Sequence, residues 1–190
     1  MALKEGTKIA TIDVALVTIK TTGETPTEIA IKTASEIGVE PQIEKTDAVK
    51  NIVKGVLIAQ KAEESTLTGH KLTLTDNVFM PEVVKILQGG TITYDAVEAT
   101  KITGYTPPVV GSTDKGQVFT VCAYSSIYDA AGVITGYECI EYPNCQGVPV
   151  AFGTKDGAFR APAYTINSAP GNGEAPYEIT YVAALPTITP

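Results

Sequence analysis

Apolar and polar residues alternate along most of this chain, and that pattern favours β-strands almost throughout. The segments predicted as strands are 8–20, 28–33, 37–44, 66–75, 91–97, 100–105, 118–128, 133–142, 148–152, 159–168 and 177–182. Pro41 restricts its strand to a sheet edge or a bulge, and Gly69 indicates a kink or bulge in the middle of another. Residues 129–132 and 155–157 are predicted to be the turns of two hairpins.

One stretch, DNVFMPEVVKILQGG at residues 76–90, predicts a helix over about 77–88. Asp76 and Asn77 suit the N-terminal cap, and Pro81 suits the first turn, where its missing N–H has no partner. Two glycines follow, and glycine often ends a helix. The apolar stripe consists of Val83, Val84, Ile86 and Leu87. A helix this short is marginal alone, so the stripe must pack on a β structure.

The segment DAVKNIVKGVLIAQK, residues 47–61, allows two interpretations. It could be a helix that begins behind Asp47. It could also be a strand that is buried largely on both faces, because apolar residues occur at both alternating sets of positions. Gly55 in its middle disfavours the helix, so the strand is the preferred prediction.

Composition bounds the fold class. The chain has 190 residues, of which 44% are hydrophobic and 18% are charged, and this suits one folded domain over 1–190. Glycine and proline number 17 and 12, and tryptophan is absent. Together with many Thr, Val, Ile and Tyr residues, these counts indicate a mainly β domain with many turns.

The net charge of −7 argues against a surface that grips phosphates. Residues 117–190 hold only Lys155 and Arg160 against six acidic residues. This acidic portion is either a solvated face or a surface that repels nucleic acid. Composition alone favours the solvated face.

Targeting signals and membrane spans are not expected. The N-terminal apolar run is short and Asp13 interrupts it, which does not fit a signal peptide, and no stretch has the length of a membrane span. Cys122, Cys139 and Cys145 are odd in number and lack metal-ligand spacing. We therefore expect free, buried thiols in a reducing compartment.

Candidate catalytic residues are few. His70 is the only histidine and is expected to be an exposed or hydrogen-bonded strand residue, which leaves no multi-histidine metal site. Ser125 and Ser126 lie within a predicted strand, away from any strand-to-helix elbow. A thiol nucleophile would have to recruit His70. No catalytic residue, cofactor or metal is expected.

The acidic pairs and glycine loops also favour structural roles. Glu63 and Glu64 are neighbours, and Glu138 and Glu141 are three apart, so in extended segments the members of each pair point to opposite faces. The loop at 171–173 precedes a predicted strand, whereas a phosphate cradle needs a helix to follow. The nine tyrosines suit cross-strand pairs and interfaces better than a sugar-binding face.

Two stretches resemble the tail tube proteins of bacteriophages and phage-tail-like particles. The first, LTGHKLTLTDNVFMPEVVKILQGGTI (67–92), has a Thr-rich strand, an Asp-Asn cap, a Pro-Glu helix start, an apolar stripe and a double glycine in the same order. The second runs from YSSIYDAAGVITGYECIEYPNC to FRAPAYTINSAP (124–170). Together they cover less than half of the chain.

The resemblance implies an antiparallel β-sandwich or partly closed barrel flanked by one helix. It further implies a structural virion protein without enzymatic activity. Copies would form hexameric rings that stack into a tube, assembled in the bacterial cytoplasm. DNA would pass through the acidic lumen without specific binding, and no membrane is involved. Sheath, tape-measure and tail-terminator proteins are the implied further partners.

Within such a tube, the hairpin 118–142 is the expected lumen-lining ribbon. The loop of small residues around 111–116 and the ends of the chain, which include a flexible tail at 186–190, are expected to contact the next ring. The helix stripe should seal the outer side of the sandwich. The opposite face of the helix, expected to meet a neighbouring subunit, a sheath or solvent, carries Glu82, Lys85 and Gln88. The alternative function is a β-sandwich decoration module that recognises a glycan or protein, and an enzyme is a distant third.

Overall fold

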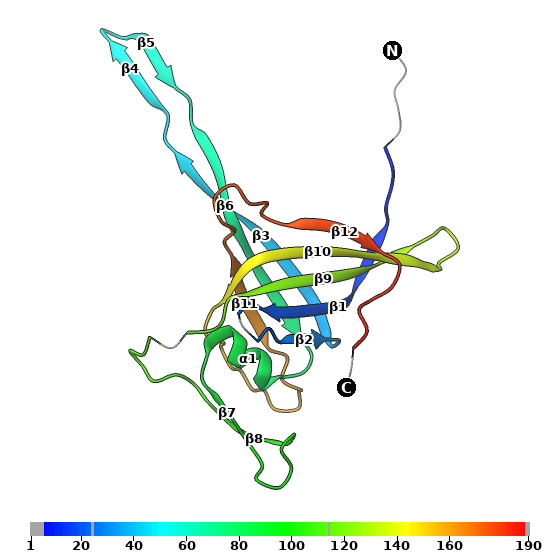
Figure 1. The fold of residues 1–190 in the computed structure, drawn as a ribbon. Coiled ribbons are helices and arrows are strands. Elements are labelled where there is room, and N and C mark those ends of the chain that lie inside the picture. Colours follow the sequence, from blue (N-terminus) through cyan, green and yellow to red (C-terminus); the bar gives the residue numbers. More distant parts are fainter. Residues whose placement is uncertain (1–5, 24, 114, 189–190) are drawn as a thin grey trace.

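Strands dominate the computed structural model, which describes residues 6–23, 25–113 and 115–188 (Figure 1). In chain order its elements are β1 (Thr11–Thr21), β2 (Glu28–Ile31), β3 (Ala34–Thr46), β4 (Val49–Val53), β5 (Val56–Lys61), β6 (Glu64–Asp76), α1 (Pro81–Gln88), β7 (Thr91–Tyr94), β8 (Ile102–Thr106), β9 (Phe119–Tyr128), β10 (Ile134–Gly147), β11 (Ala163–Ser168) and β12 (Glu178–Val182).

The main sheet is antiparallel and runs in the order β2-β1-β9-β10-β11-β6-β3, with β12 paired to β10 off this path. The first part of β10 pairs with β9 and β12, and its last residues pair with β11. Strand β10 therefore belongs to both halves of a bent sheet. Strand β1 of one half contacts β3 of the other half. This confirms the predicted antiparallel sandwich or partly closed barrel, built here from one continuous sheet.

The two halves of the sheet enclose one hydrophobic core. Its fully buried side chains include Val17, Ile19, Ile31, Leu72, Leu74, Phe119, Val121, Tyr164 and Ile166. They come from β1, β2, β6, β9 and β11, so every layer of the sandwich contributes. Burial of such side chains is the main favourable term in folding.

The helix is shorter at its start than the sequence predicted. It begins at Pro81, and its N-cap residue, Met80, makes no side-chain capping bond. Asp76 and Asn77 do not cap it, because β6 continues to Asp76. That residue is fully buried, and its Oδ1 accepts a hydrogen bond from the backbone N–H of Val78 at 3.3 Å. The Asx turn replaces the expected cap.

The apolar stripe of α1 packs on the core, as predicted. Its buried side chains are Val83, Val84, Ile86 and Leu87. Two glycines bring the surrounding backbone close to it. A Cβ added at Gly116 would lie 2.1 Å from the carbonyl oxygen of Leu87, and one at Gly147 would lie 2.5 Å from its Cα. In Figure 1, α1 lies at the end of the sheet away from the β4–β5 hairpin.

The polar face of α1 is only partly available to a neighbour. Lys85 is exposed, but Gln88 is tied down within the chain. Its Nε2 donates to the Tyr105 hydroxyl at 2.9 Å, and its Oε1 accepts from the N–H of Val150 at 2.8 Å. The expectation that Gln88 faces a neighbour, a sheath or solvent is therefore wrong, because β8 and the loop after β10 close over the last helical turn.

The predicted strand 148–152 is wrong. The predicted turn at 155–157 is present, with the Ala158 N–H donating to the Lys155 carbonyl at 3.3 Å, but no strands flank it, so it does not form a hairpin. Strand β10 continues through Pro143 to Gly147, beyond its predicted end. A register shift between Tyr142 and Cys145 lets the strand accommodate this proline. Residues 148–162 then form a loop, so β11 pairs with the end of β10 and with β6.

Two local predictions are confirmed. Pro41 lies in β3, which is the edge strand of the main sheet. The register between β3 and β6 shifts next to Gly69, because Gln42 pairs with Gly69 while Ile43 pairs with Leu67. The extra residue is therefore Thr68, and it forms a bulge where the two strands leave the body of the sandwich.

Candidate functional site

His70 is buried in β6, with only 6% of its surface exposed. Its ring packs edge-on against Tyr142 and Tyr177, with centroids 5.7 and 5.4 Å away. Within the described residues, its Nδ1 has no hydrogen-bond partner. The prediction of an exposed side chain is wrong, because the two tyrosines cover it. The ring is one member of an aromatic cluster.

The three cysteines are free, as predicted. Cys122 and Cys139 interact on the face of the sheet away from the core, and this contact lowers the pKa of Cys139 and raises that of Cys122. Cys145 is fully buried, and its Sγ donates to the Tyr142 carbonyl at 3.2 Å. Burial raises the pKa of Cys145 to about 11. Among the described residues no cluster suits a metal ion.

Glu63 and Glu64 each bind a different lysine. Glu63 forms an ion pair with Lys45, and Glu64 forms one with Lys61, both at 3.5 Å. More than half of each side chain is exposed, so these pairs contribute little stability. Both lie at the base of the β4–β5 hairpin, where Lys45–Glu63 crosses between the two sides of the ribbon and Lys61–Glu64 is a local i,i+3 pair on one side.

Glu138 and Glu141 lie on opposite faces of β10, as predicted. Glu138 pairs with Ser125 of β9, and Glu141 pairs with Cys122 on one side and Glu178 of β12 on the other, in an uninterrupted register. Glu141 and Glu178 therefore place two carboxylates side by side on the face away from the core. Ser125 and its neighbour Ser126 lie within β9, as predicted.

The loop at 171–173 leads into β12, as predicted. Its backbone N–H donor at Gly171 is already bound by the Glu174 side chain. The Glu174 carboxylate accepts the N–H of Gly171 at 2.8 Å and the side-chain amide of Asn144 at 3.2 Å. The tyrosines are divided between core and surface: Tyr142 and Tyr164 are buried, whereas Tyr177 and Tyr181 are 41% and 56% exposed.

The most unusual surface of this protein is a projecting β-ribbon, called the arm below and formed by residues 43–67. The outer parts of β3 and β6 leave the body together and continue as the β4–β5 hairpin (Figure 1). Lys54 and Gly55 form its tip, with φ of 48° and 83°. Positive φ at both central residues is typical of a type I′ turn, which matches the twist of a two-stranded ribbon.

Apolar side chains of the arm are exposed on both of its faces. Ile52 and Ile58 are 58% and 62% exposed. The other large apolar residues exposed on the arm are Ile43, Val49, Val53, Val56, Leu57 and Leu67. An isolated two-stranded ribbon is marginal in water, and a contiguous apolar surface of this kind is typical of an interaction site. The arm therefore presents an exposed apolar surface that is suited to bind a partner.

The arm also differs from the body in charge. Segment 47–61 carries Lys50, Lys54 and Lys61 against Asp47, which gives 3 − 1 = +2. The whole chain carries −7, so the remaining residues carry −7 − 2 = −9. The arm as a whole, residues 43–67, carries four lysines and four acidic residues, 4 − 4 = 0, so only its outer segment, 47–61, is basic.

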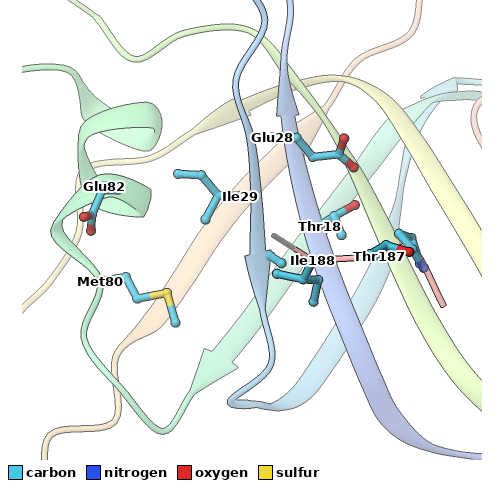
Figure 2. Close-up of a pocket in the computed structure, with 9 residues that line it drawn as sticks. Thr18, Glu28, Ile29, Met80, Glu82, Thr187 and Ile188 are labelled. Carbon is cyan, nitrogen blue, oxygen red and sulfur yellow. The ribbon is translucent and has the colours of Figure 1, made fainter. Parts of the chain in front are cut away.

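A groove lies between β2 and the start of α1 (Figure 2), and these elements lie toward the end of the molecule away from the arm (Figure 1). Its volume is about 590 Å³, and its apolar lining includes Ile29, Met80 and Ile188. Its charged lining residues are Glu28 and Glu82. The groove runs along β2, which ends the main sheet and has no strand partner on its outer side within the described part of the chain. This surface is called the β2–α1 groove.

Two features extend the β2–α1 groove. An adjoining cavity of about 180 Å³ shares Ile29 and Glu82 and reaches Lys85 and Ile92. Part of the predicted tail also lines the groove, since Thr187 and Ile188 lie across from β2 (Figure 2). Residues 189 and 190 of that predicted tail lie outside the described residues.

The sequence correctly predicted strand structure in 47–61, but it did not predict that this segment is exposed. The prediction of a strand buried on both faces is wrong, because β4 and β5 pair only with each other and no other element among residues 6–23, 25–113 and 115–188 covers them. The available signal was Lys54-Gly55, a turn dipeptide between two apolar runs. It divides the segment into a hairpin that extends from the sheet.

Comparison with known proteins yields no relative: no protein-family model matches the chain, and no curated protein is significantly similar to it. Within the described residues, no helix has the length and apolar character needed to cross a membrane.

Proposed function

We propose that this protein is a structural subunit that assembles with copies of itself into stacked hexameric rings. These rings form a tail tube of the phage kind through which DNA passes. The observation that carries the proposal is the arm, whose exposed apolar residues have no covering partner in the described part of the chain. In this proposal the role is structural, and the protein is part of a virion tail.

The energetics of the arm favour repeated contacts between copies. Six large apolar residues of β4 and β5 are each between 50% and 65% exposed. Burying what remains exposed contributes on the order of 1 kcal/mol for each of them. Association also costs several kcal/mol in lost freedom of motion. A tube in which every copy both gives and receives an arm repeats this gain along its length.

The edges of the sheet support the same proposal. Strands β2 and β3 end the main sheet, and β3 is 13 residues long. Long unpaired edges favour uncontrolled pairing between chains, and a closed ring of subunits removes them. Pairing of edge strands around a ring also builds a barrel with a central lumen.

Charge supports passage of DNA without binding. Glu141 and Glu178 lie side by side on the face of β10 and β12 away from the core. In the proposal, this face of the β9–β10 hairpin lines the lumen, where carboxylates repel phosphates. The overall charge of −7 and the resemblance of 67–92 and 124–170 to tail tube proteins agree with this role.

Replacing the arm tests the proposal. In the test variant, residues 47–63 are replaced by Asn-Gly, a two-residue turn that joins Thr46 directly to its cross-strand partner Glu64. We expect the full chain to form rings or tubes in negative-stain electron microscopy. The variant should remain monomeric, with an unchanged cooperative urea transition of the body.

The matched control removes exposed apolar residues outside the arm. Val97 and Val110 are fully or almost fully exposed, so a Val97→Ser/Val110→Ser variant should assemble like the unaltered chain. Normal tubes from the arm-less variant would overturn the role of the arm. A full chain that stays monomeric at high concentration, and binds a glycan on an array, would replace the proposal with the decoration module.

A further inference from the structure

We infer that the arm tip of one copy docks in the β2–α1 groove of the next copy, where Lys50 and Lys54 meet Glu28 and Glu82. The inference rests on the proposed self-assembly and identifies the contact that drives it. The occupant of the groove is thus a second copy of this chain.

The apolar surfaces of tip and groove match. Val53 and Val56 flank the turn and are 50% and 60% exposed. The groove offers Ile29, Met80 and Ile188, and its volume of about 590 Å³ lies in the range of cavities that enclose small ligands. Branched side chains at the tip of a narrow hairpin can therefore enter it.

The charges are complementary as well. Neither Lys50 nor Lys54 forms an ion pair within the described residues, and the charged residues that line the groove are both glutamates. Lys85 lines only the smaller adjoining cavity. Ion pairs that are partly desolvated in an interface set its specificity and register.

Lys20 is the other cation near the groove. It lies opposite Glu28 in the β1–β2 register, and no ion pair joins them within the described chain. The arm lysines would therefore add the direct partner that Glu28 lacks.

Backbone geometry adds a third match. Among the residues that the structure describes, the outer edge of β2 along the groove has no strand partner, and neither do the outer edges of the β4–β5 hairpin. A strand that joins such an edge gains main-chain hydrogen bonds in addition to side-chain contacts. The groove can therefore hold the arm in one register.

The positions of the two surfaces determine the kind of assembly. In Figure 1 the arm leaves one end of the molecule, whereas β2 and α1 lie toward the other. Two different surfaces at different ends make a head-to-tail contact, and such contacts propagate into rings or stacks rather than closing as a two-fold dimer. The same contact can therefore repeat between successive subunits of a tube.

Charge reversal in two separate variants tests the inference. One variant carries Lys50→Glu and Lys54→Glu, and the other carries Glu28→Lys and Glu82→Lys. We expect each alone to raise the concentration needed for assembly at least ~tenfold, because attraction becomes repulsion. Mixed in equal amounts, the two should assemble together, since a reversed arm fits a reversed groove. Sedimentation and electron microscopy measure both effects.

Controls separate this contact from charge in general and from misfolding. A Lys101→Glu/Lys155→Glu variant makes the same change in net charge as Lys50→Glu/Lys54→Glu, at exposed sites away from the arm, and it should assemble like the unaltered chain. Urea unfolding checks that every variant is folded. A wild-type chain that forms tubes while both reversed variants do so equally well would overturn the docking and leave self-assembly standing. Failure of the wild-type chain to assemble would instead overturn the proposed function.

Discussion

The body and the arm use similar residues in opposite surroundings. In the body, Val17 and Ile19 are completely buried, because β1 lies between β2 and β9 and faces the core. In the arm, Ile52 and Ile58 are 58% and 62% exposed, because β4 and β5 have only each other. Branched apolar residues therefore specify a strand but do not specify what covers it. In the body the chain supplies its own cover, and for the arm we propose that another copy does.

The same substitution in the two regions should have the most different results. Val84→Asp places a charge at a fully buried position of α1, where an unpaired charge costs about 3–5 kcal/mol. This is a large part of a typical domain's stability, so the variant should not fold. Ile58→Asp lies on the arm and should change the free energy of unfolding by less than about 0.5 kcal/mol while it weakens assembly.

Circular dichroism and urea titration separate these outcomes. Loss of the cooperative transition is expected for Val84→Asp only. A soluble, tube-forming Val84→Asp protein would mean that the packing of α1 on the core is wrong. An Ile58→Asp protein without a cooperative transition would mean that the arm is part of the folding unit.

Glycine substitutions should give the next largest difference in stability between the body and the arm. A Cβ at Gly69, in the body, would lie 2.2 Å from the carbonyl oxygen of Ser168, so Gly69→Ala should cost at least about 1–3 kcal/mol. At Gly55, in the arm tip, no atom lies within 4 Å, but φ is +83°. Gly55→Ala should therefore cost only about 1 kcal/mol, confined to the hairpin turn.

Urea midpoints measure the glycine variants, with Gly153→Ala as control, since its site is open and its φ is ordinary. The control should unfold like the unaltered chain. Equal midpoints for Gly69→Ala and Gly153→Ala would contradict the close approach of β6 to Ser168.

The parts of the fold that the sequence predicts correctly are those that local patterns determine. The stripe Val83–Leu87 and the following glycines define a helix within a few residues, and most strands follow from alternation. The errors occur where a distant partner overrides a local signal. Asp76 looks like a cap, but it pairs with Ala34 at the end of β6. Pro143 looks like a break, but a bulge carries β10 past it to its partner β11.

The candidate site was less predictable for the same reason. The outer part of the arm, 47–61, is one continuous segment of the sequence. Its exposure depends on which other elements pack nearby, and no local pattern encodes that. The β2–α1 groove combines Glu28, Met80, Glu82 and Ile188, which are far apart in the sequence and meet only in the fold. No local sequence pattern joins residues that are this far apart in the chain.

Ionisation of Cys145 at high pH should destabilise the body by less than Val84→Asp does. Burial raises the pKa of Cys145 to about 11 from an ordinary value of 9.0, against smaller lowering effects of hydrogen bonds from Ser168 and Val121. A raised pKa contributes stability that is complete below pH 9 and is lost as the pH rises toward 11. At pH 10 the loss is roughly 1 kcal/mol. The arm has no cysteine, so only the body should respond to this thiol.

Cys145→Ala isolates this thiol from the tyrosines that titrate in the same range. Burial also raises the pKa of Tyr142 and Tyr164, and these residues remain in the variant. Urea titrations at pH 8 and pH 10 should show a smaller fall in the free energy of unfolding for Cys145→Ala than for the unaltered chain. The packing cost of the substitution appears at both pH values and cancels in this difference. An identical fall in the two proteins would show that the Cys145 thiol is not buried when it ionises. The end of β10 would then be less well sealed from solvent than the rest of the body, and it would differ less from the exposed arm.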